Sequence, residues 1–98
     1  TWLHGEHSYG EFSNHWIVTE TEKYIWYSET GEEQYFCLKE DPHELINRIG
    51  DAGCQDRIKE LRGHLIDSLK GRLEGFTDGS VLITGRPYLP TLPSATEA

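Results

Sequence analysis

The sequence predicts an α+β fold in which a small antiparallel sheet of three or four strands packs against one long C-terminal helix. Two observations lead to this prediction. Short segments rich in aromatic and β-branched residues fill the first 38 positions and are separated by brief polar connections, as in a meander of strands. From about residue 55 the apolar spacing becomes that of an amphipathic helix. Ninety-eight residues bury one core, so we expect a single domain over 1–86 and an extended, proline-containing tail over 87–98.

The strands are expected between residues 2 and 38. Thr21 and Glu22 form one short connection, and Gly31 can supply the positive φ that the next turn requires. A further strand at the start of the chain would be interrupted at Gly5. The segments with strand composition are 2–9, 12–20, 23–28 and 34–38.

Helix-start signals follow the sheet. Asp41 can cap free amides, Pro42 suits a first helical position, and Glu44 completes a capping-box arrangement, which together predict a short helix over 42–46. Asp51 is a candidate N-cap for the main helix that follows.

The main helix is predicted over 54–74. Gly63 and Gly71 each weaken a helix by about 1 kcal/mol relative to Ala, so we expect packing on the sheet to compensate. Gly75 is a natural C-terminal stop. The apolar stripe expected to face the sheet consists of Ile58, Leu61, Leu65, Ile66, Leu69 and Leu73.

The sheet has more large apolar residues than one helix can cover. Nine of the eleven aromatic residues fall within 2–36. Alternation places Tyr24 and Trp26 on one face and Ile25 and Tyr27 on the other. An uncovered aromatic face usually marks an interface, so we expect a missing partner. A chain without Met that begins at Thr1 fits the same expectation, that of a piece of a longer protein.

Charge excludes some functions. The net charge is −8, and residues 1–50 hold ten acidic against three basic side chains. Such a surface repels phosphate backbones, so we expect no nucleic-acid partner. The apolar runs fall far short of the ~20 residues that span a bilayer, so no membrane partner is expected either.

The densest cluster of metal-capable side chains is His4-Gly5-Glu6-His7. On a strand, His4 and Glu6 share one face and His7 points to the other, so the three do not converge and we expect no independent metal site. His15 lies on another predicted strand, and nothing in the spacing places it with them.

No catalytic nucleophile stands out. The serines lack a setting such as G-x-S-x-G. Cys37 and Cys54 have no framework of spacings around them, and we expect two free thiols.

The aromatic residues leave a second class of function open. A stand-alone carbohydrate-binding or protein-interaction module could use Trp16, Trp26 or Tyr27 as a stacking surface, provided that these rings are exposed and roughly coplanar.

Three motifs in order carry a resemblance to a known family. They are Lys23-Tyr24-Ile25-Trp26-Tyr27, Gly31-Glu32-Glu33-Gln34-Tyr35-Phe36-Cys37-Leu38 and Asp41-Pro42-His43-Glu44-Leu45-Ile46-Asn47. Their order and spacing resemble the C-terminal signature of arylsulfatase-type sulfatases, in the alkaline phosphatase-like superfamily. Two positions depart from that signature: Cys37 stands where Asp or Asn is usual, and Arg48 where Leu is usual.

The resemblance implies a C-terminal subdomain docked on a large α/β catalytic domain. In sulfatases that domain carries a formylglycine, made from a C/S-x-P/A-x-R motif, and the Asp and Asn ligands of a calcium ion. Neither cysteine here lies in that motif, so the resemblance implies that the fragment alone is inactive and meets a sulfate-ester substrate only through the parent enzyme. An exported or periplasmic location would fit the family, although the residues themselves leave the compartment open.

The resemblance also suggests which residues reach the substrate-pocket rim. His4, Glu6 and His7 are the candidates, because polar residues at a strand end beside an interface have no structural need to be there. In the isolated fragment, a second copy forming a homodimer is the expected substitute for the missing catalytic domain.

Overall fold

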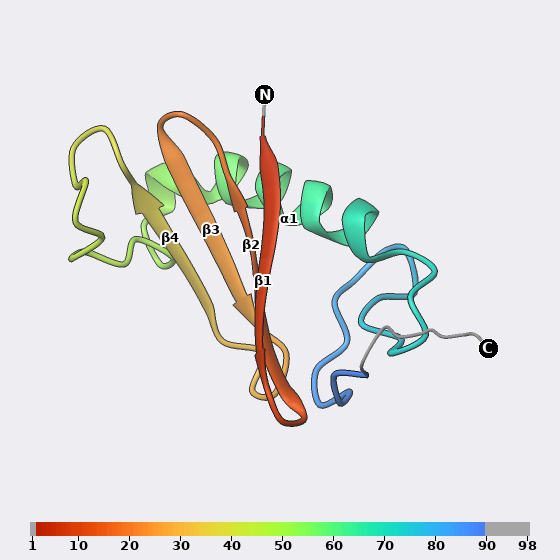
Figure 1. Cartoon of the computed structure of the whole chain (residues 1–98). Coiled ribbons are helices and arrows are strands. Elements are labelled where there is room, and N and C mark those ends of the chain that lie inside the picture. Colours follow the sequence, from red (N-terminus) through yellow and green to blue (C-terminus); the bar gives the residue numbers. More distant parts are fainter. Residues whose placement is uncertain (1, 90–98) are drawn as a thin grey trace.

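The computed structural model describes residues 2–89 and confirms the predicted α+β class. One antiparallel sheet has the strand order β1-β2-β3-β4, and Figure 1 shows the helix α1 crossing one of its faces. A 3₁₀ turn, η1 (Ala52–Cys54), runs directly into helix α1 (Gln55–Leu69). Asp51, predicted to cap the main helix, caps η1 instead: its carboxylate accepts the N–H of Gly53 at 2.8 Å, whereas the N-cap of α1 is Cys54, which makes no side-chain cap. The strands are β1 (Leu3–Tyr9), β2 (Phe12–Val18), β3 (Glu22–Tyr27) and β4 (Glu33–Cys37).

The hydrophobic core lies between α1 and the face of the sheet that the helix covers. The apolar stripe predicted for the helix supplies one side of it, and alternate residues of β2, β3 and β4 supply the other. Phe76, beyond the helix, is also fully buried there. The core residues are Ile17, Tyr24, Trp26, Tyr35, Ile58, Leu61, Leu65, Leu69 and Phe76.

The main helix is shorter than predicted. It ends at Leu69 instead of residue 74, because Lys70 adopts an extended ψ of 137° and Gly71 a φ of +78°. Leu73, expected on the apolar stripe, is therefore outside the helix and 88% exposed. This early turn carries the following segment back toward the sheet, where Phe76 completes the core.

The short helix predicted over 42–46 does not form. Asp41 does accept two amide protons, from Leu45 at 3.0 Å and Ile46 at 2.8 Å, as a cap would. However, Glu44 has a φ of +58°, which is incompatible with a right-handed helix. The capping interactions therefore stabilise a turn in place of a helix.

The segment after this turn follows the open edge of β4. The Tyr35 N–H donates to Asn47 Oδ1 at 3.0 Å, and the Arg48 N–H donates to the Tyr35 carbonyl at 2.8 Å. These bonds satisfy backbone groups that an edge strand would otherwise expose. Pairing with the sheet edge competes with helix formation here.

The far face of the sheet, away from α1, is partly covered by its own side chains. The Trp16 indole lies over Gly5, where an added Cβ would come within 2.2 Å of Nε1. Ile25, directly across from Trp16, is only 8% exposed. Around this centre, Tyr9 and Phe12 are 51% and 40% exposed. The uncovered aromatic surface is therefore smaller than the alternation alone suggested.

The segment after α1 returns to the edge of the sheet where β2 begins and β3 ends (Figure 1). The Gly85 N–H donates to the Ser28 carbonyl at 2.7 Å, and the Tyr88 N–H donates to the Glu11 carbonyl at 2.9 Å. The first residues of the predicted tail thus pack on the domain, and the rest of it, 90–98, lies outside the described residues. Within 2–89, no helix is both long and apolar enough to cross a bilayer.

Candidate functional site

Polar side chains from both ends of the chain meet beside the edge strand β1. His4 and Glu6 point to the α1 side of the sheet, and His7 points to the far face, as the strand alternation predicted. The β1–β2 register sets Glu6 directly opposite His15. The hairpin thus joins His15 to His4 and Glu6, a meeting that the linear spacing did not indicate. A two-residue turn at Gly10-Glu11 was the sequence signal that would have fixed this register.

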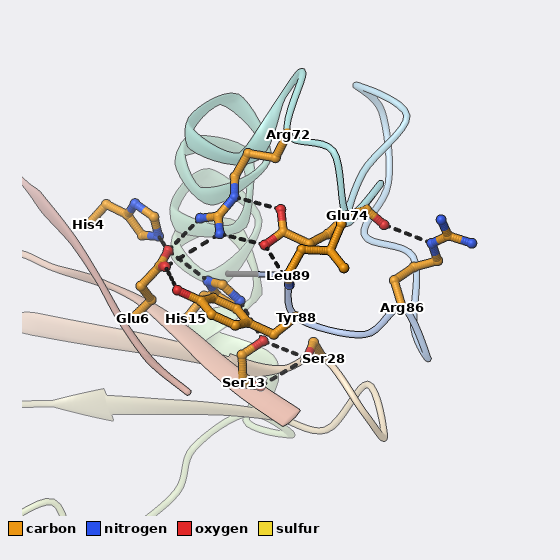
Figure 2. Close-up of polar contacts among 10 residues, drawn as sticks. All are labelled: His4, Glu6, Ser13, His15, Ser28, Arg72, Glu74, Arg86, Tyr88 and Leu89. Atoms are coloured by element: carbon orange, nitrogen blue, oxygen red, sulfur yellow. Dashed lines mark hydrogen bonds and ion pairs between the residues drawn. The ribbon is translucent and has the colours of Figure 1, made fainter. Parts of the chain in front are cut away.

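Arg72 lies between Glu6 and Glu74 and pairs with both carboxylates (Figure 2). Its guanidinium donates to Glu6 Oε1 at 2.5 Å and to Glu74 Oε2 at 2.9 Å. The Tyr88 hydroxyl donates to Glu6 Oε2 at 3.2 Å. Arg72, Glu74 and Tyr88 were not among the predicted site residues, because they lie more than sixty positions from Glu6 in the sequence.

The two carboxylates of the cluster are held ionised. Burial alone would raise the pKa of Glu6, but hydrogen bonding to Arg72 and its positive charge outweigh burial and lower that pKa. Burial likewise opposes ionisation of Glu74, and the Arg72 hydrogen bond again lowers the pKa. Glu74 is only 3% exposed, so its pairing with Arg72 is needed to keep the charge at that depth.

His15 is the most buried member of the cluster, with no exposed surface. Its Nε2 lies 3.0 Å from Ser13 Oγ, which in turn lies 2.8 Å from Ser28 Oγ. Its Nδ1 faces Glu6 Oε1 at 3.5 Å. Burial lowers the pKa of His15 to about 4, so the ring is neutral at pH 7. Burial also lowers the pKa of His4.

Ser13, His15 and Glu6 are connected in the order of a serine-hydrolase triad, but the arrangement cannot work as one. Ser13 is 2% exposed, so a substrate carbonyl cannot reach its Oγ. Its position between His15 and Ser28 indicates a buried hydrogen-bond chain that orients the imidazole.

The two cysteines are free, as predicted. Burial raises the pKa of the Cys54 thiol, which disfavours the reactive thiolate.

The proposed stacking surface for a carbohydrate is not formed as envisaged. Trp26 is 2% exposed and belongs to the core, so it cannot stack on a sugar. Trp16 lies against Gly5, with the Lys23 ammonium 5.6 Å from its ring centroid. The most exposed aromatic side chains lie instead on the β1–β2 hairpin, Tyr9 at 51% and Phe12 at 40%, and Leu3 on the same hairpin is 68% exposed.

No protein-family model matches the chain. The chain is 53% identical over 90 residues to an arylsulfatase of Clostridium perfringens (strain 13 / Type A). The aligned part covers 89% of this chain and 19% of that relative. The resemblance inferred from the three motifs is therefore confirmed, and the chain spans about a fifth of the length of the curated relative that it matches.

Proposed function

We propose that this chain, which is homologous to a segment of an arylsulfatase, is the non-catalytic C-terminal subdomain of a sulfatase, a sulfuric ester hydrolase. The observation that carries the proposal is the high identity along nearly the whole chain to only a fifth of the relative. The remaining four-fifths is long enough to hold a separate catalytic domain. The subdomain would complete that domain and contribute to its substrate-pocket rim.

The chemistry of sulfate-ester cleavage is assigned to the rest of the enzyme. Cys37 is followed by Leu-Lys-Glu-Asp and Cys54 by Gln-Asp-Arg-Ile, so neither fits the C/S-x-P/A-x-R motif that yields formylglycine. Calcium takes oxygen ligands, whereas the cluster beside β1 offers two imidazole nitrogens and one carboxylate. The metal-ligating cluster found among residues 2–89 therefore does not suit calcium, neither cysteine can yield formylglycine, and both groups are assigned to the proposed catalytic domain.

The far face of the β1–β2 hairpin is the proposed docking surface for that domain. Leu3, Tyr9 and Phe12 are exposed on this face, next to the half-buried Trp16. Burying apolar surface gains about 25 cal/mol per Å², so exposed apolar side chains on one face favour association. The occupant is the remainder of a sulfatase, because the homologous segment occurs within a much longer arylsulfatase chain.

Among the three rim candidates, His7 suits contact with substrate best. It is exposed on the proposed docking face and packs against Tyr9, with ring centroids 5.6 Å apart. His4 and Glu6 lie on the opposite face, where Glu6 is engaged by Arg72. In the parent enzyme, His7→Ala should raise KM for a sulfate ester with little change in kcat, because it removes binding and leaves the nucleophile intact.

The proposal is tested by comparing this chain with its parent enzyme. An aryl sulfate ester assay with added calcium should show turnover by the parent and none by the 98-residue chain, since only the parent contains the formylglycine and its metal. Heat-treated protein provides the background rate. Turnover by the chain above that background would show that it carries its own active site.

A further inference from the structure

Three metal-ligating atoms converge beside β1. Glu6 Oε1 lies 3.8 Å from His4 Nε2 and 3.5 Å from His15 Nδ1, and all three atoms lie within 4.8 Å of one another. They come from a single hairpin: His4 and Glu6 are two residues apart on β1, and His15 is the partner of Glu6 on β2. Figure 2 shows these side chains directed toward one another. The hairpin register alone is enough to assemble the set.

The hydrogen-bond chain behind His15 determines which of its nitrogens carries the proton. Ser28 Oγ donates its one proton to the Ser13 carbonyl at 3.0 Å. Ser13 Oγ must then be the donor to Ser28 Oγ, and it accepts the Nε2–H of His15. In a neutral ring that donates its Nε2–H to Ser13, Nδ1 carries a lone pair and no proton.

The lone pair on His15 Nδ1 accepts no hydrogen bond from the described residues. His15 Nδ1 is aimed at Glu6 Oε1, which is also an acceptor, and both His15 Nδ1 and His4 Nε2 are buried without a hydrogen-bond partner among the described residues. An unsatisfied buried polar atom costs about 1–3 kcal/mol. Two such nitrogens and a carboxylate oxygen around one point have the arrangement of ligands around a cation.

We propose that His4 Nε2, Glu6 Oε1 and His15 Nδ1 bind a divalent transition-metal ion, of which Zn²⁺ fits the donor set best. Two imidazoles and one carboxylate are a common ligand set for Zn²⁺, which leaves a fourth position open. Zinc–ligand bonds are about 2.0–2.2 Å long, so the three donor atoms would have to move closer together by at most about 1.5 Å. Rotation of the side chains can supply this movement. His4 and Glu6 are part-exposed, so the open position would face solvent.

The charges around the cluster permit a cation. Glu6 and Glu74 together carry two negative charges, and Arg72 supplies one positive charge between them. One negative charge therefore stays uncompensated among these side chains. Arg72 uses one lone pair of Glu6 Oε1 and leaves the other for a metal ion. A metal ion binds imidazole in its neutral form.

The surroundings of the ligands also match those of known metal sites. A metal-binding histidine almost always donates its other ring N–H to an acceptor that fixes its orientation, and Ser13 Oγ has this role for His15. Tyr88 holds the second oxygen of Glu6. A bound ion would tie the edge strand β1 to β2. This inference is independent of the proposed sulfatase role, because calcium does not suit these ligands.

The test is Zn²⁺ binding by the 98-residue chain after dialysis against a chelator. Cysteines also bind zinc, so Cys37 and Cys54 are first changed to Ser. Competition with a chromogenic zinc chelator should give one ion per chain, and Co²⁺ should bind without a thiolate charge-transfer band. Calcium should not compete. The melting temperature should rise with Zn²⁺, because an ion that binds only the folded state stabilises it.

Variants separate this site from chance binding. His4→Gln and Glu6→Gln should each weaken Zn²⁺ binding by at least about tenfold. His7→Gln, on the same strand but on the opposite face of the sheet, should bind Zn²⁺ as the unsubstituted chain does. Circular dichroism verifies that each variant is folded. Absence of a stoichiometric site, or equal loss of binding in His4→Gln and His7→Gln, would overturn the proposal.

Discussion

At the scale of single residues, close packing at Gly5 decides how the far face of the sheet is covered. The Trp16 indole occupies the space where a side chain at position 5 would lie. Glycine, which the sequence suggested would interrupt the first strand, is instead required for an aromatic ring to lie flat across β1. The strand continues through it without a break.

Gly5→Ala should destabilise the protein by about 1–3 kcal/mol, the usual cost of overpacking, because the added Cβ would come within 2.2 Å of the Trp16 ring. Gly63→Ala is the matched control. It lies in α1 with no atom within 4 Å of the new Cβ, so it should gain up to about 1 kcal/mol of helix stability. Urea unfolding measures both. Equal effects of the two substitutions would contradict the packing at Gly5.

A second residue-scale effect links the sheet to the helix. Glu22 receives hydrogen bonds from Arg57 on α1 and from the Tyr35 hydroxyl at 2.6 Å. The Arg57 hydrogen bond lowers the pKa of Glu22 below its ordinary value of 4.5. A carboxyl group whose pKa is lower in the folded state stabilises that state above its unfolded pKa, and the stabilisation is lost as the pH falls through the folded value.

Arg57→Gln should therefore cost most stability above about pH 4.5, and the difference from the wild type should shrink as the pH falls below that value. Urea unfolding at several pH values measures this difference. Arg48→Gln is the control, because the ion pairs of Arg48 within residues 2–89 are with exposed Glu40 and Asp51, and such pairs contribute about 0–1 kcal/mol. A wild-type–Arg57→Gln difference that does not vary with pH would contradict this linkage.

At the scale of elements, α1 holds the sheet through its apolar stripe, and the end of the helix determines which leucines belong to that stripe. Leu65 and Leu69 are fully buried, whereas Leu73 is almost fully exposed. The periodic spacing was correct up to Leu69 and misleading at Leu73. Spacing reports the face on which a residue would lie, but only if the helix continues.

Leu65→Ala should lower the free energy of unfolding by about 2–5 kcal/mol, as large-to-small changes in packed cores do. Leu73→Ala, the same substitution at an 88% exposed position, should change it by less than about 0.5 kcal/mol. Denaturant unfolding curves measure both changes in the free energy of unfolding, from the shift in midpoint at an unchanged dependence on denaturant concentration. Similar losses at the two positions would mean that the helix extends to residue 74.

At the scale of the whole molecule, the two faces of the sheet differ in how far the chain itself covers them. One face is covered by α1 and by the segment that ends at Tyr88. The other presents Leu3, Tyr9 and Phe12 at the β1–β2 hairpin. In the proposed sulfatase, the catalytic domain would cover this second face. In the isolated chain, the same surface is free to bind a second copy.

The isolated chain should therefore bind an apolar-surface dye and self-associate as its concentration rises, measured by size exclusion with light scattering. Tyr9→Ser combined with Phe12→Ser should reduce both effects, because it removes two exposed aromatic rings from the hairpin. Leu45→Ser is the control, at a 79% exposed position outside the hairpin. A strictly monomeric wild type that binds no dye would show that the far face needs no partner.

The sequence by itself determined the features that depend on local pattern. Alternation placed Tyr24 and Trp26 together on one face of β3, which is the face that α1 covers, and the helical spacing identified the buried leucines of α1 up to Leu69. The three ordered motifs were enough to indicate the sulfatase resemblance that the arylsulfatase comparison confirms. The alternation and the helical spacing depend on neighbours a few residues apart, whose relative directions are set by strand and helix geometry.

Only the tertiary structure decided how the candidate site is assembled. His15 joins His4 and Glu6 through the register of the β1–β2 pair. Arg72, 66 positions after Glu6, reaches Glu6 because α1 ends at Leu69 and the chain turns at Gly71. Likewise, the turn at Glu44 forms because the following residues bond to the β4 edge. Register, chain reversal and edge pairing are settled by contacts between distant segments, whose free energies no local pattern contains.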